Sequence, residues 1–168
     1  MIFRKKQPQA ARPPTALAHL QALVAQHLPE GDEDMRTIVV AIAGLLASVA
    51  YADRQYHEAE QSHVREALAR VHGLSAAGVE AICEALRQHL LELASSNAQQ
   101  HTRNLRELGD LELRRDVLDA LVDLAAADED LSMSETSLLR RTATALGLTQ
   151  DDYVAAQARH RERLSVLR

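Results

Sequence analysis

Residues 37–52, TIVVAIAGLLASVAYA, form the longest stretch of the sequence that contains neither a charged residue nor a histidine. Acidic residues flank the stretch on both sides. As a helix it would span about 24 Å, which is less than the roughly 30 Å of a membrane's hydrocarbon core. We therefore predict a buried helix at the centre of a globular core and no transmembrane segment.

The remaining sequence is typical of an all-α protein. Of its 168 residues only 2% are aromatic, and one is a cysteine, which excludes a disulfide framework. Ala, Leu, Glu, Gln and Arg, which favour helices, dominate the sequence. We expect a compact array of seven to eight helices, with residues 95–104 as the main loop. The predicted helices cover residues 15–28, 32–52, 58–72, 75–93, 106–127, 133–146 and 150–164.

Charge is distributed unevenly along the chain. Residues 1–29 carry four basic residues and no acidic one, whereas the 15 basic and 24 acidic residues of 30–168 give that part a formal charge of −9. Residues 1–14 contain three prolines and no secretory signal, so we predict a disordered basic tail before a single domain of residues 15–168 in a cytoplasmic protein. The tail leaves open a weak peripheral contact with an anionic membrane surface, and the acidic body argues against nucleic-acid binding.

The two halves of the chain resemble each other at an offset of 75 residues. Residues 42–60, IAGLLASVAYADRQYHEAE, align with residues 117–135, VLDALVDLAAADEDLSMSE. Each copy is an apolar helix that ends in Ala-X-Ala-Asp and is followed, after six residues, by a Glu that opens the next helix. We infer an internal duplication of a helical hairpin, with repeats at about residues 37–74 and 112–148.

The acidic residues at these two corners are the candidate functional residues: Asp53, Glu60, Asp128 and Glu135. An Asp at a helix C-terminus opposes the helix dipole, so it needs either backbone N–H partners or a bound cation. A Glu in the first turn of a helix is favourable, and Ser132 with Glu135 fits a capping box. If the four carboxylates meet, they would suit a divalent cation such as Ca²⁺, Mg²⁺ or Mn²⁺. The other interpretation is that each pair only caps and pins its own corner.

These two corner motifs resemble the twin motif of the tellurite-resistance TerB-like family, which is related to the N-terminal domain of a DnaJ-like co-chaperone. The resemblance covers about residues 32–150. It implies a compact all-α domain, an association with tellurite resistance and the stress response, and divalent-metal binding by the four corner acids. The sequence departs from the family at Arg54 and Glu129, where the family often has Gly.

Other kinds of active site find little support in the sequence. Glu60 and His63 have the spacing of a di-iron ligand pair, but the second repeat has Leu138 where a His would be needed. Cys83 lies on an apolar helix stripe, so we predict a buried residue rather than a nucleophile. We expect a non-enzymatic stress-response module with an unknown protein partner and a divalent cation as its only cofactor. The alternative is a protein–protein interaction domain whose acidic corners are structural caps.

Overall fold

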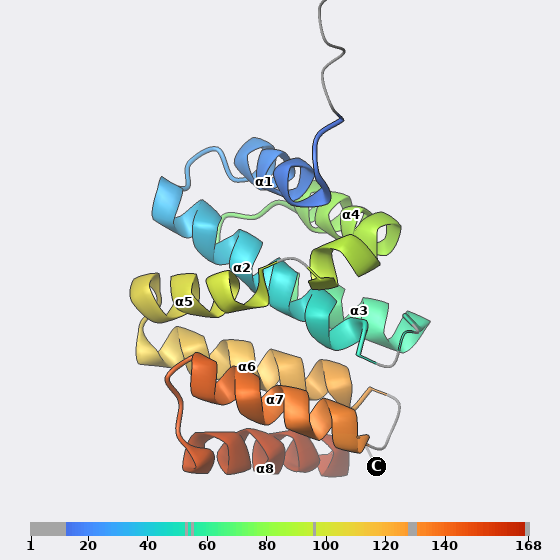
Figure 1. Cartoon of the computed structure of the whole chain (residues 1–168), viewed down its shortest axis with the longest axis vertical. Helices are drawn as coiled ribbons and strands as arrows, with labels where there is room; N and C mark the ends of the chain where they lie inside the picture. Colours follow the sequence, from blue (N-terminus) through green and yellow to red (C-terminus); the bar gives the residue numbers. More distant parts are fainter. Residues whose placement is uncertain (1–12, 53, 55, 96, 128–130, 167–168) are drawn as a thin grey trace, which may run out of the picture.

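The computed structural model describes residues 13–52, 54, 56–95, 97–127 and 131–166, and these residues form eight α-helices and no strand (Figure 1). The all-α prediction is therefore confirmed. Residues 1–12 of the predicted tail lie outside the described residues. The helices are α1 (Ala16–His27), α2 (Glu33–Ala50), α3 (Glu58–Ala69), α4 (Ala76–Ser95), α5 (Ala98–Leu108), α6 (Leu111–Ala125), α7 (Met133–Ala145) and α8 (Gln150–Val166).

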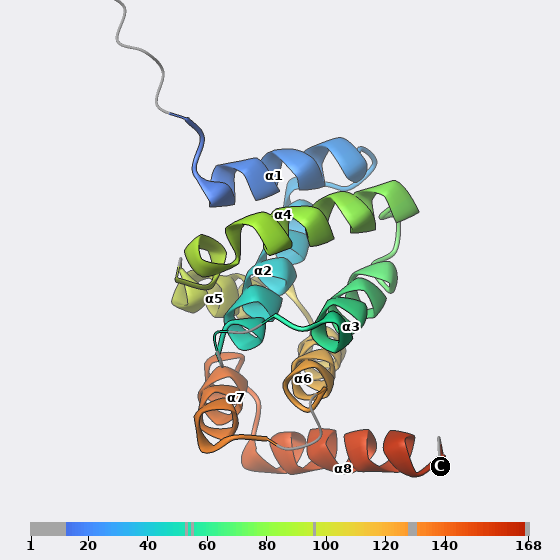
Figure 2. The same cartoon turned by 90° about the vertical axis from the view of Figure 1, so that its right-hand side faces the viewer.

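Helix α2 lies at the centre of the molecule, as its apolar sequence predicts. It packs against α1, α3, α4, α5, α6 and α7, whereas α1 and α8 lie at opposite ends of the molecule (Figure 2). Every residue from Val39 to Ala47 is buried. Asp32 caps the helix by accepting the backbone N–H of Met35 at 2.8 Å. None of the described helices combines the length and apolar character needed to cross a membrane.

Helix α5 occupies most of the segment that the sequence predicts to be a loop, so that prediction is wrong. The inward positions of α5 include the polar residues His101 and Thr102 beside Leu105, which is why an apolar periodicity does not reveal the helix. The close approach of α5 to α2 depends on Gly44, because a Cβ at that position would overlap the His101 imidazole. The predicted helix 106–127 is also interrupted, since α5 ends before Gly109 and Asp110 caps a separate α6.

The hairpins α2–α3 and α6–α7 end in similar ways. Gly73 follows α3 and Gly147 follows α7, and both have the left-handed backbone that glycine adopts without a steric cost (φ 84° and 73°). After α7 the chain forms a Schellman motif, in which Leu148 N–H donates to Ala143 O at 2.9 Å. After these two glycines the chain continues into α4 and α8, respectively.

Helix α8 is held against α6 largely by charged groups. Only Tyr153 and Ala156 of its described residues are fully buried. Acidic and basic side chains of the two helices pair across their interface. The contacts are Arg115–Asp152 (2.8 Å), Arg159–Asp119 (2.7 Å), His160–Asp123 (2.6 Å) and Arg163–Asp123 (2.5 Å).

Candidate functional site: the two acidic corners

The first corner is built around the carboxylate of Glu60, at the start of α3. One of its oxygens, Oε2, accepts the backbone N–H of His57 at 2.8 Å, and the residue is only 4% exposed. The N–H groups of a first helical turn have no acceptor within the helix, so a carboxylate there satisfies a donor and interacts favourably with the helix dipole. The Glu60 side chain thus stabilises the beginning of its own helix.

The second corner repeats this arrangement at the start of α7. Glu135 Oε2 accepts the backbone N–H of Ser132 at 2.7 Å, and Ser132 Oγ accepts the backbone N–H of Glu135 at 3.1 Å. The predicted capping box is therefore confirmed. Glu135 is buried, like Glu60. Each glutamate therefore uses one carboxylate oxygen to cap the start of its own helix.

The two aspartates of the predicted set, Asp53 and Asp128, lie outside the described residues, as does Glu129. Arg54, next to Asp53, is described, and it has a positive φ of 63°. This is the backbone region that glycine favours, so the first corner uses the conformation for which the family often has glycine although the residue is Arg. A residue with a Cβ carries a steric cost in this region, so Arg54 adds strain at this position.

The helices that carry the two glutamates share only part of their neighbours. Helix α3 packs against α2, α4 and α6, and α7 packs against α2, α5, α6 and α8. The two helices do not run side by side in either view (Figures 1 and 2). Among the described residues, no three His, Cys, Asp or Glu side chains are grouped so that they could hold a metal ion.

Cys83 lies near the first corner, on α4, in the lining of a small hollow that it shares with Tyr56. The thiol is half-buried and packs against the core. Burial raises the pKa of Cys83 to about 11, with Glu80 adding to the rise and Arg65 opposing it. The pKa of the Tyr56 phenol is also raised, first by burial and then by Cys83 and Glu60. Both groups are therefore protonated at neutral pH, which suits packing and not nucleophilic attack.

Two buried polar residues were not predicted from the sequence. Asp123 on α6 receives Arg163 and His160 from α8, and His101 on α5 lies against Gly44. Neither belongs to a short motif, and both depend on a partner more than 35 residues away in the sequence. The only signal in the sequence is a polar residue at an inward helical position, which does not identify its partner.

The fold and its corners define a class of protein: an all-α domain that contains two helical hairpins, each with a buried glutamate at the start of its second helix. A comparison with family models assigns the chain within this class. The model of the family described as tellurite resistance protein TerB matches residues 39–158, and the chain belongs to this family. No curated protein and no solved structure matches the chain.

Proposed function

We propose that the chain is a non-enzymatic module of the tellurite-resistance response, that it acts in the cytoplasm by binding a protein partner, and that its acidic corners are structural. Membership of the TerB family supports the association with tellurite resistance. The observation that carries the structural role is the bonding of Glu60 and Glu135, each of which accepts a backbone N–H at the start of its own helix. A carboxylate in this position stabilises a hairpin without any ligand.

An apolar groove supports the proposed binding role. It has a volume of about 500 Å³ and lies between α2, α3, α6 and α8. Charged residues, among them Arg70 and Asp116, form part of its lining. A partly apolar surface with charged edges is typical of protein-interaction sites. Its apolar lining residues are Met35, Ile38, Val39, Ile42, Ala67, Val71, Leu113 and Val117.

The groove can be tested by placing a charge in it. We expect Val71→Glu to abolish the protection against tellurite that the expressed chain gives a sensitive host, because a desolvated carboxylate would oppose docking. Val154→Glu is the matched control, since Val154 is 48% exposed on α8 and does not line the groove. Circular dichroism would check that both variants fold. Full protection by folded Val71→Glu would contradict the proposed role of the groove.

The second candidate function is binding of a divalent cation by Asp53, Glu60, Asp128 and Glu135. It is favoured by the matched positions of these acids in the two repeats and by the burial of both glutamates. In this case Ca²⁺, Mg²⁺ or Mn²⁺ would stabilise the folded chain by mass action.

Thermal unfolding separates the two roles of the corners. Chelator-stripped protein would be unfolded with Ca²⁺, Mg²⁺, Mn²⁺ and Zn²⁺ added singly, beside the double variant Asp53→Asn/Asp128→Asn. Structural corners predict a midpoint that no ion raises. A dose-dependent rise that the double variant loses would instead establish cation binding and contradict a purely structural role.

A further inference from the structure

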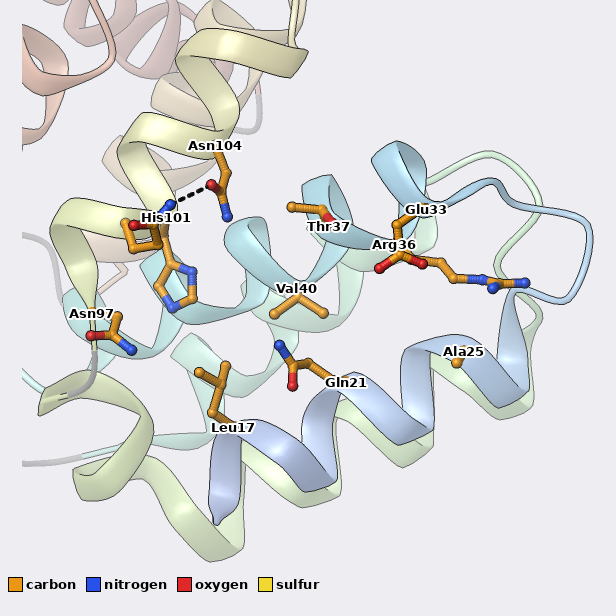
Figure 3. A pocket seen from close by; sticks show the side chains of 11 residues that line it. Leu17, Gln21, Ala25, Glu33, Arg36, Thr37, Val40, Asn97, His101 and Asn104 are labelled. Atoms are coloured by element: carbon orange, nitrogen blue, oxygen red, sulfur yellow. Dashed lines mark hydrogen bonds between the residues drawn. The ribbon is translucent and has the colours of Figure 1, made fainter. Parts of the chain in front are cut away.

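Two hollows on the described surface differ in character. One lies between α1, α2 and α5, and polar side chains that are exposed to solvent, such as Gln21 and Asn97, form much of its lining (Figure 3). Water satisfies such groups, so this hollow has no need of a partner. The other is the apolar groove between α2, α3, α6 and α8, with a volume of about 500 Å³. A partner that removes its apolar lining from water would gain free energy.

Three helices present aliphatic side chains to the groove at helical spacing. Helix α2 contributes a stripe at positions i, i+3, i+4 and i+7, and α3 and α6 contribute one i, i+4 pair each, so each set lies on one face of its helix. The stripe on α2 is about 10 Å long, which corresponds to two helical turns. In this order the residues are Met35, Ile38, Val39 and Ile42, then Ala67 and Val71, then Leu113 and Val117.

The apolar lining is not fully covered by the chain itself. Val39, Ile42 and Val117 are buried, whereas the other five residues are only half-buried against the core. A helix laid between the three ridges would cover the half-buried side chains. An extended peptide fits less well, because it adds to the edge of a sheet and the described residues form no strand. A proline-rich peptide needs a groove lined by aromatic rings, and the lining contains no Phe, Tyr or Trp.

The charged residues of the lining differ in whether they are paired. Arg163 and Asp119 already take part in the ion pairs between α6 and α8. Within the described part of the chain, Arg70 at the end of α3 and Asp116 on α6 form no ion pair, and both are exposed. These two charges are hydrated and do not themselves require a ligand. They would instead select among the helices that the apolar ridges can bind, as rim charges do in protein interfaces.

We propose that the groove between α2, α3, α6 and α8 binds an amphipathic α-helix of a partner protein. The helix has two turns of aliphatic side chains on one face, an acidic side chain toward Arg70 and a basic side chain toward Asp116. This inference rests on the proposed docking role of the groove and adds the chemistry of the partner. The mode of binding is a helix in a groove, with anchors at positions i, i+3, i+4 and i+7.

The test is binding of synthetic helical peptides to the full-length chain, measured by fluorescence anisotropy at physiological ionic strength. Three peptides carry the same leucine stripe at i, i+3, i+4 and i+7. They differ in the flanks of this stripe, which have glutamate on one side and lysine on the other, lysine on both sides, or glutamate on both sides. We expect saturable binding and a preference of about threefold for the mixed peptide, because exposed charge pairs contribute weakly. A fourth peptide, with glutamine in place of leucine, should not bind.

Charge reversal at either edge should change this preference in opposite directions. Arg70→Glu makes both edges acidic, so it should shift the preference to the peptide with lysine on both flanks. Asp116→Lys makes both edges basic and should shift the preference to the peptide with glutamate on both flanks. Arg103→Glu and Asp151→Lys are the matched controls, because both residues are exposed and lie outside the lining. They change the net charge equally but should leave the preference for the mixed peptide unchanged.

Three results would each overturn the proposal: no saturable binding of any leucine peptide, equal binding of the glutamine peptide, or a preference that Arg70→Glu and Asp116→Lys leave unchanged. Dimerisation of the chain alone, lost in Val71→Glu, would also overturn it, because a second copy would then occupy the groove. Failure of the proposed docking role is distinct, since it is decided by tellurite protection in folded Val71→Glu. A groove that protection requires but that binds no peptide contradicts only the helix.

Discussion

The two helical hairpins, α2–α3 and α6–α7, have similar corners but very different surroundings. In both, a buried glutamate accepts a backbone N–H at the start of the second helix. The first helices differ, because α2 is buried along its whole middle whereas α6 turns acidic residues toward α8. Ser48 and Asp123 occupy equivalent positions. Ser48 donates to the backbone oxygen of Gly44 at 3.0 Å, and Asp123 accepts from Arg163 of α8.

The comparison separates what is local in this fold from what is not. The corners are alike because capping needs only residues within one turn of each other. The central residues of α2 and α6 differ because each helix packs against a different set of neighbouring helices. An internal repeat can therefore keep the same turns while the packing surfaces of its helices differ between a central and a peripheral position.

The largest effect should come from equivalent core leucines. Leu46 of α2 and Leu121 of α6 are both fully buried, and replacing either by Ala would leave a cavity. We expect each change to lower the free energy of unfolding by about 2–5 kcal/mol, with the larger loss for Leu46 because α2 is covered on more sides. Urea unfolding measures the difference, and a larger loss for Leu121→Ala would contradict the central place assigned to α2.

A smaller effect is expected at the polar positions that distinguish the two first helices. Asp123→Asn should cost about 1–3 kcal/mol, because the carboxylate is buried between Arg163 and His160. Ser48→Ala should cost less, about 0.5–1.5 kcal/mol, since one neutral hydrogen bond is lost. Only the loss at Asp123 should shrink in high salt. Equal salt dependence of the two variants would argue against the ionic contact between α6 and α8.

His101 makes α5 sensitive to pH. Burial holds its pKa below the ordinary value of about 6.5, so the unfolded chain binds more protons than the folded chain once the pH falls below 6.5. The free energy of unfolding should therefore fall as the pH is lowered from 7 to 5. His101→Gln should show a shallower fall over the same range by urea unfolding. Identical slopes would show that protonation of His101 does not contribute.

The smallest effect concerns the turn of the first corner. Arg54 has a positive φ, so Arg54→Gly removes a strained left-handed residue. We expect a gain of about 0.5–1 kcal/mol, partly offset by the greater freedom of glycine in the unfolded chain. Thermal unfolding gives the sign, and Arg70→Gly, at a residue with an ordinary helical φ of −78°, is the control that should lose stability.

The sequence was sufficient to predict those parts of the molecule that depend on neighbouring residues. The apolar run of α2 and the capping box of Ser132 and Glu135 both follow local rules. Helix α5 could not be predicted in this way because His101 points inward only where Gly44 leaves room for it. The contacts of Asp123 with α8 likewise depend on how distant helices meet. The acids Asp53 and Asp128 remain predicted members of the candidate site, together with the two glutamates whose caps are described.

The most direct test of the account is a double-mutant cycle on Glu60→Ala and Glu135→Ala, measured by urea unfolding with Ca²⁺, Mg²⁺ or Mn²⁺ present. Each single variant leaves a backbone N–H at a helix start without its acceptor and should lose about 1–2 kcal/mol. Because each glutamate caps its own helix, the two losses should add within about 0.5 kcal/mol. A coupling energy above about 1 kcal/mol, seen with the cation and abolished by chelator, would contradict independent structural corners and show that the two glutamates share a bound ion.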